Sequence, residues 1–219
     1  QADLGRSYEV ITLAMGGLNT PQEIHLFEKE GLAYKPDLMI LNFVLNDADF
    51  YTEYNATQRY QAEKDSVVGV LGISINPAFK RTLKSSALVY FLKQRFEHAI
   101  GMFLGKEEIG YFENLWGKAE NRQRVTNGFD RLWVMSKDSS FPVLVVIWPI
   151  LTEFSRYKFE HIHQWVREEA EKRGFQTLDL LPHFAKTSYR NLQVTAEDNI
   201  HPNGLGHKIG ADAFLEWIR

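Results

Sequence analysis

An aspartate and a histidine stand three residues apart just before the last helical pattern of the chain, in Asp198-Asn199-Ile200-His201-Pro202. In one tight turn the Asp198 carboxylate can accept a hydrogen bond from Nδ1–H of His201, which leaves Nε2 free to act as a base. The spacing therefore offers two members of a nucleophile–histidine–acid triad on one loop. The alternative is a polar helix entry, in which Asn203 caps the helix and His201 is only exposed.

Two other segments place polar or flexible groups directly after strand-like runs. Asn46, followed by Asp47, ends an apolar run, and its side-chain N–H could donate to an oxygen that gains negative charge in a transition state. Gly17 follows another run, and its backbone N–H could point into the same site. The alternatives are an ordinary Asn-Asp turn and an ordinary strand-to-helix turn, both of which use these residue types.

Elements that could position these groups are visible as alternating strand and helix patterns. Short apolar runs predict buried parallel strands at residues 8–13, 38–45, 143–148 and 175–180. Helical patterns are predicted over residues 21–34, 157–173 and 203–218. The first should begin at Thr20 as N-cap, with Glu23 three residues on, and the second should stop at Gly174. This alternation indicates a parallel sheet covered on both faces, with ligands at the carboxyl ends of its strands.

About a hundred residues between Leu45 and Val143 exceed any ordinary crossover loop and must contain structure of their own. Helices are predicted over residues 80–100 and 117–136. The charges of the first are mostly basic, and an apolar segment at 101–105 follows it. It is interpreted either as a lid or membrane-surface helix over the site, or as a helix packed on the sheet with its charges in solvent.

Taken in this order, Gly17, Asn46, Asp198 and His201 resemble the motifs of the SGNH hydrolases, also called the GDSL esterase/lipase family. The resemblance implies that Gly17 and Asn46 donate to an oxyanion, and that Asp198 and His201 belong to a catalytic triad.

The same resemblance implies a flavodoxin-like three-layer α/β/α fold with a parallel sheet. It also implies that residues 1–219 form one domain, with a helical insertion at about residues 50–140 between the Asn46 strand and the Val143 strand.

Two departures from the family pattern stand out. Val44 occupies a position where the family often has glycine, and the Gly-Asp-Ser nucleophile block is absent, because no serine ends a first strand ahead of Gly17. In the strand order 2-1-3-4-5, the missing strand would lie between the strands at 8–13 and 38–45, and each unpaired buried backbone group would cost about 1–3 kcal/mol. We therefore expect a segment preceding Gln1 to supply the first strand and the serine, which makes this chain N-terminally incomplete. A degenerate member without the serine is the alternative.

The function that the resemblance implies is serine-dependent hydrolysis of acyl esters through an acyl-enzyme, as in esterases, lipases and deacetylases. The alternatives are acyl transfer to sugar hydroxyls and a catalytically inactive binding module. No metal or cofactor is required. Asp47 and His207 could support the site, and Asp179 is a second acid that could orient the histidine. His161 and His163 should point to different faces of a helix, which argues against a metal site.

Composition limits the partners. The formal charge of −3 over 219 residues gives no overall attraction to nucleic acid or anionic lipid. The chain has no cysteine, which excludes disulfides and thiol nucleophiles and leaves the compartment open, extracytoplasmic or cytoplasmic. The expected substrate is a small-molecule, carbohydrate or lipid ester.

Overall fold

The computed structural model describes residues 8–15, 17–49, 107–196 and 198–218. The chain divides into two compact units, one formed by Gln1–Asp49 with Asn114–Arg219 and the other by Phe50–Glu113. The sheet and every predicted site residue belong to the first unit. The helix predicted over residues 80–100, with its proposed contact to a membrane surface, lies outside the described residues.

The sheet has three parallel strands in the order β1-β2-β3. Their bounds are Met39–Val44 for β1, Val143–Trp148 for β2 and Gln176–Asp179 for β3. The strand predictions at residues 38–45, 143–148 and 175–180 are confirmed. All six residues of β2 are apolar and five of them are buried, as expected of a central strand covered on both faces.

The strand predicted at residues 8–13 is wrong. Residues 8–15 have no regular secondary structure, and the side chain of Val10 is 84% exposed. An extended segment needs a neighbouring strand to satisfy its N–H and C=O groups. The strand expected between it and β1 is not among the described residues, so β1 is an edge of the described sheet and the apolar run has no neighbour to pair with.

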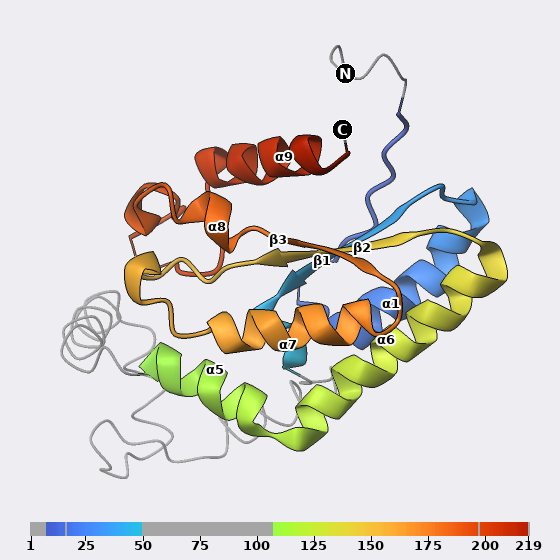
Figure 1. Cartoon of the computed structure of the whole chain (residues 1–219), viewed down its shortest axis with the longest axis horizontal. Helices are drawn as coiled ribbons and strands as arrows, with labels where there is room; N and C mark the ends of the chain where they lie inside the picture. Colours follow the sequence, from blue (N-terminus) through green and yellow to red (C-terminus); the bar gives the residue numbers. More distant parts are fainter. Residues whose placement is uncertain (1–7, 16, 50–106, 197, 219) are drawn as a thin grey trace, which may run out of the picture. The chain divides into compact units, whose positions relative to one another are not determined.

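Helices cover both faces of this sheet (Figure 1). In the first unit the helices are α1 (Thr20–Glu30), α6 (Ala119–Ser139), α7 (Glu160–Glu171), α8 (Leu181–Phe184) and α9 (Gly204–Ile218), and α5 (Glu107–Gly117) begins in the second unit and ends in the first. The 3-10 turns are η1 (Gly31–Tyr34), η2 (Leu45–Ala48), η4 (Phe154–Arg156) and η5 (Tyr189–Asn191). α6 and α7 pack on one face, where the ring of Phe43 in β1 lies 5.9 Å from Trp116 and 6.2 Å from Phe129.

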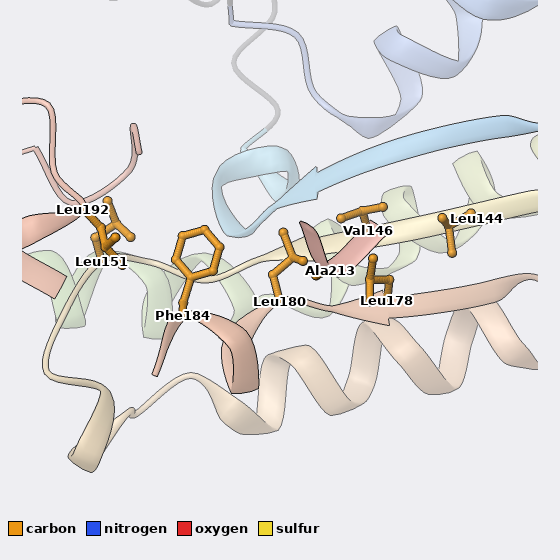
Figure 2. Packing of buried hydrophobic residues seen from close by; sticks show 8 residues of the cluster. All are labelled: Leu144, Val146, Leu151, Leu178, Leu180, Phe184, Leu192 and Ala213. Atoms are coloured by element: carbon orange, nitrogen blue, oxygen red, sulfur yellow. The ribbon is translucent and has the colours of Figure 1, made fainter. Parts of the chain in front are cut away.

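The opposite face carries a second apolar cluster beneath α8 and α9. Alternate residues of β2 and β3 point into it, together with side chains from the segments that follow the strands (Figure 2). Its buried members are Leu144, Val146, Leu151, Leu178, Leu180, Phe184, Leu192 and Ala213. Because Leu151 and Leu192 lie in loops, this cluster also fixes the segments that follow β2 and β3 on the core.

Local capping residues set the helix ends, and the N-cap of α1 lies one residue before the predicted position. Asn19, not Thr20, is the N-cap of α1, because its Oδ1 accepts from the Gln22 N–H while Gln22 Oε1 accepts from the Asn19 N–H. Gly174 has the predicted left-handed conformation, with φ +74°, but α7 itself ends at Glu171 and residues 172–174 form a turn. Among the helices of the described residues, none is long and apolar enough to span a bilayer.

Candidate active site

The carboxyl ends of the three strands meet at one edge of the sheet. Val44 pairs with Trp148 between β1 and β2, and Ile147 pairs with Asp179 between β2 and β3, so the strands end side by side. Asn46 lies in the turn η2, directly after β1. Ligands of open parallel sheets bind at this edge.

The loop that carries Asp198 and His201 is attached to the same edge. The N–H of Leu151, shortly after β2, donates to the carbonyl of Asn199 at 2.7 Å. Nδ1 of His201 lies 3.0 Å from each carboxylate oxygen of Asp198. The His201 side chain is 74% exposed, and no residue in the described part of the chain hydrogen-bonds to Nε2. A carboxylate on Nδ1 with Nε2 open is the arrangement that a histidine base requires.

Backbone donors keep Asp198 ionised. Its Oδ1 accepts from the N–H of His201 at 2.8 Å and from the N–H of Ile200 at 3.1 Å. The His201 N–H is the largest influence on this carboxyl group, and together with the Ile200 N–H and the His201 ring it holds the pKa of Asp198 below its usual value despite slight desolvation. A charged Asp198 favours the His201 tautomer that carries its proton on Nδ1.

The loop before α1, which contains Gly17, and the turn after β1, which contains Asn46, are hydrogen-bonded to each other. Nδ2 of Asn19 donates to the carbonyl of Asp49 at 3.2 Å, which ties the loop before α1 to the turn after β1. Gly17 has φ +81°, a left-handed conformation that glycine adopts without strain. Oδ1 of Asn46 is buried and has no hydrogen-bond partner within the residues described.

Glu23 and Asp47 form an acid pair that the sequence analysis missed. Oδ2 of Asp47 accepts from the Val44 N–H at 2.9 Å, so Asp47 holds the turn that contains Asn46. Burial and then the charge of Glu23 raise the pKa of Asp47 well above its usual value. Burial also raises the pKa of Glu23 from 4.5 to about 7. The pair therefore retains a proton near neutral pH.

The sequence contains Glu23, but its position three residues after Thr20 predicts a capping box and not a partner for Asp47. Because the cap is one residue earlier, Gln22 does that work and Glu23 is left to face Asp47.

Comparison with models of protein families matched the GDSL-like Lipase/Acylhydrolase family over residues 1–209. The chain belongs to this family. The resemblance to SGNH hydrolases is therefore confirmed, and at the level of the family the activity is hydrolysis of esters. Comparison with curated proteins and with solved structures gave no match.

For a GDSL-like chain, the serine is the part of the site that the described residues do not supply. Ser155 Oγ donates to Glu153 at 3.0 Å, and Ser136 Oγ donates to the carbonyl of Trp133 at 2.8 Å. Of the serines that the structure describes, none hydrogen-bonds to His201. The other candidate residues, Asp179, His161, His163 and His207, contact residues other than His201.

Asp179 and the other histidines of this GDSL-like chain have different partners from His201. Asp179 accepts from Nδ1 of His163, not from His201. The His207 ring packs edge-on against Trp148 at 5.8 Å. His161 is exposed whereas His163 is fully buried, as their spacing on α7 predicts. Within the described ranges, no three potential metal ligands lie together.

Proposed function

We propose that this protein hydrolyses acyl esters through an acyl-enzyme, with His201 as the base and acid and Asp198 as the carboxylate that orients it. The observation that carries the proposal is the contact of His201 Nδ1 with both Asp198 oxygens, with Nε2 left open at the carboxyl edge of the sheet. Membership of the GDSL-like family supports the ester as the bond that is broken.

In this mechanism a serine Oγ attacks the ester carbonyl carbon, and its proton passes to Nε2 of His201. The negative charge that forms on the carbonyl oxygen is held by the Gly17 N–H and the Asn46 side-chain N–H. His201 then gives the proton to the leaving alcohol as the C–O bond breaks. Water attacks the acyl-enzyme in the same way, with His201 taking its proton, and releases the acid and the serine.

The nucleophilic serine is proposed to lie on a strand that pairs with β1, as the family pattern implies. One observation supports an additional strand there. Among the described residues β1 pairs only with β2, so it is an edge of the described sheet and has no strand on its other side. A strand placed beside β1 would bring its carboxyl end to the edge where Asn46 and His201 lie.

Hydrolysis of p-nitrophenyl acetate by the full-length protein tests the assignment of His201. His201→Ala is expected to lower kcat/KM by about three orders of magnitude or more, because both proton transfers lose their carrier. His25→Ala, an exposed histidine on α1, is the control and should retain full activity. A loss below tenfold in His201→Ala would contradict the triad assignment.

Two further results would redirect the proposal. If the full-length protein shows no turnover on any aryl ester, the site is a binding site that has lost catalysis. If product appears only when a sugar hydroxyl is supplied as acceptor, the reaction is acyl transfer with the same residues, since transfer and hydrolysis differ only in the acceptor.

A further inference from the structure

His163 lies at the centre of a buried hydrogen-bond network that the proposed reaction does not use. Its side chain is fully buried in α7. Nδ1 lies 2.9 Å from Oδ1 of Asp179, at the end of β3, and Nε2 lies 3.0 Å from the hydroxyl of Tyr157. The Tyr157 hydroxyl also accepts from the N–H of Ile150 at 3.0 Å. One side chain thus connects the segments that follow β2 and β3.

One arrangement of protons satisfies every partner of His163. Because the Tyr157 oxygen accepts the Ile150 N–H, its own proton can be donated to Nε2 of His163, and Nδ1–H donates to Asp179. Burial raises the pKa of Tyr157, which keeps its hydroxyl protonated. Burial opposes the ionisation of Asp179, but the hydrogen bonds from His163 and Leu181 and the nearby charge of Arg167 outweigh it and lower the pKa of Asp179. Every member of the network is therefore satisfied without solvent.

This network reaches the loop of Asp198 and His201 through one short step along the chain. Ile150 is held by Tyr157, and the next residue, Leu151, donates its N–H to the carbonyl of Asn199 at 2.7 Å. Asn199 stands between Asp198 and His201 in the sequence.

A second contact reinforces the same connection. Nε2 of Gln193, a buried side chain, donates to the carbonyl of Leu151 and to Oδ1 of Asn199. The other backbone contacts of this loop lead to residues 192–194: the His201 carbonyl accepts from the Val194 N–H at 3.3 Å, and the Asn203 N–H donates to the Leu192 carbonyl at 2.7 Å. The Leu151–Asn199 bond ties the loop to the segment after β2, so the position of the Asp198–His201 pair depends in part on where residues 150 and 151 are held.

We propose that His163, acting through Tyr157, is a positioning residue for the Asp198–His201 pair. The network fixes Ile150 and Leu151, and the Leu151–Asn199 bond transmits that position to the loop. The catalytic part of this inference rests on the proposed function, whereas the effect on the loop does not. His163 touches no reacting atom, so its removal should misplace His201 without removing a proton carrier.

Tyr157→Phe is the sharpest test, because it deletes one buried hydroxyl and leaves the ring in place. Amide hydrogen exchange, read by NMR, is expected to show about tenfold weaker protection at Leu151, and the His201 ring signals should shift or broaden. With aryl ester as substrate, kcat should fall about tenfold while KM stays within twofold, because the loss concerns geometry in the transition state.

The matched control is Val166→Ala, which truncates a fully buried side chain on α7, one turn after His163. It should lower global stability at least as much as Tyr157→Phe but leave Leu151 protection relative to neighbouring residues, the His201 signals and kcat unchanged. If Val166→Ala produces the same changes, or if Tyr157→Phe produces none in a folded protein, the proposal is overturned.

Two additions keep the outcome decisive. If Tyr157→Phe does not fold, His163→Asn retains a donor toward Asp179 and deletes only the bond to Tyr157. If the wild-type protein has no esterase activity, the proposed function fails, but the exchange and ring signals still decide whether the network positions the loop. In an active enzyme, Tyr157→Phe should have no further effect on kcat once Asp198→Asn is present, because both act through His201.

Discussion

Glu23 and Asp47 hold a proton at a pH where exposed carboxyl groups have lost theirs. Burial raises the pKa of Glu23 from 4.5 to about 7, so the folded state binds a proton that the unfolded state releases over this range. Stability should therefore fall as pH rises from about 4.5 to about 7, by an amount on the order of 3 kcal/mol. Urea unfolding at several pH values in this window measures the slope.

The control for this prediction is Glu23→Gln, which replaces the acid by a neutral group of the same shape. We expect the variant to be about as stable as the wild type at pH 4.5 and more stable at pH 8, with a flatter profile between them. An unchanged slope in Glu23→Gln would show that another group is responsible.

Replacing Asp198 and replacing Asp179 should have different effects on stability and on catalysis. Asp198 is partly exposed, so Asp198→Asn should change the free energy of unfolding by less than about 1 kcal/mol. It should nevertheless lower kcat by about 10³–10⁴-fold, because His201 loses the acceptor that sets its tautomer. Denaturant unfolding and esterase kinetics on the same preparation separate the two effects.

Asp179→Asn should have a larger effect on stability than on catalysis. It removes a charge that accepts from the fully buried His163, so the loss of stability should reach about 2 kcal/mol. If Asp198→Asn proves the more destabilising variant, or if Asp179→Asn has the larger effect on kcat, the roles assigned to the two acids are reversed.

At the scale of the element, α9 approaches the sheet closely at one glycine. A Cβ placed on Gly210 would lie 2.7 Å from Cη2 of Trp148, whose indole N–H donates to Oδ1 of Asn42 at 3.0 Å. Gly210→Ala should therefore force the helix or the indole to move, at a cost of about 1–3 kcal/mol. Thermal or urea unfolding measures it.

Gly204→Ala is the matched change on the same helix, because nothing lies within 4 Å of a Cβ at Gly204. Alanine is the better helix former, so this variant should equal or exceed the wild type in stability. A Gly210→Ala variant as stable as Gly204→Ala would mean that α9 does not depend on this contact.

Element predictions differed in success according to what each element needs. The strand at residues 143–148 and the left-handed Gly174, three residues after the end of α7, were predictable, because a continuous apolar run and a glycine after a helical pattern are local features. The strand at residues 8–13 was not, because its hydrogen bonds would come from a neighbour that is not among the described residues. The N-cap of α1 was displaced by one residue because Asn19 and Gln22 bond reciprocally, whereas Thr20 Oγ1 has no hydrogen-bond partner within the described residues.

For the whole molecule, the edge of β1 is the feature with the widest consequence. If a further strand pairs with β1, about half of the amide groups of residues 39–44 gain a partner. Hydrogen exchange by mass spectrometry should then show slower exchange of this segment in a protein that carries the proposed additional strand than in the chain Gln1–Arg219. Segment 143–148, central in both, serves as the internal reference. Equal exchange of residues 39–44 in the two proteins would contradict strand addition at this edge.

The sequence by itself determined the parallel sheet strands, the main helices of the first unit and the pairing of Asp198 with His201. Each of these rests on hydrophobic periodicity or on a contact over three or four residues. Only the tertiary structure decided that Glu23 faces Asp47 and that His163 joins the ends of β2 and β3. Those relations depend on burial and on hydrogen bonds between distant segments, and neither quantity is encoded in any short stretch of residues.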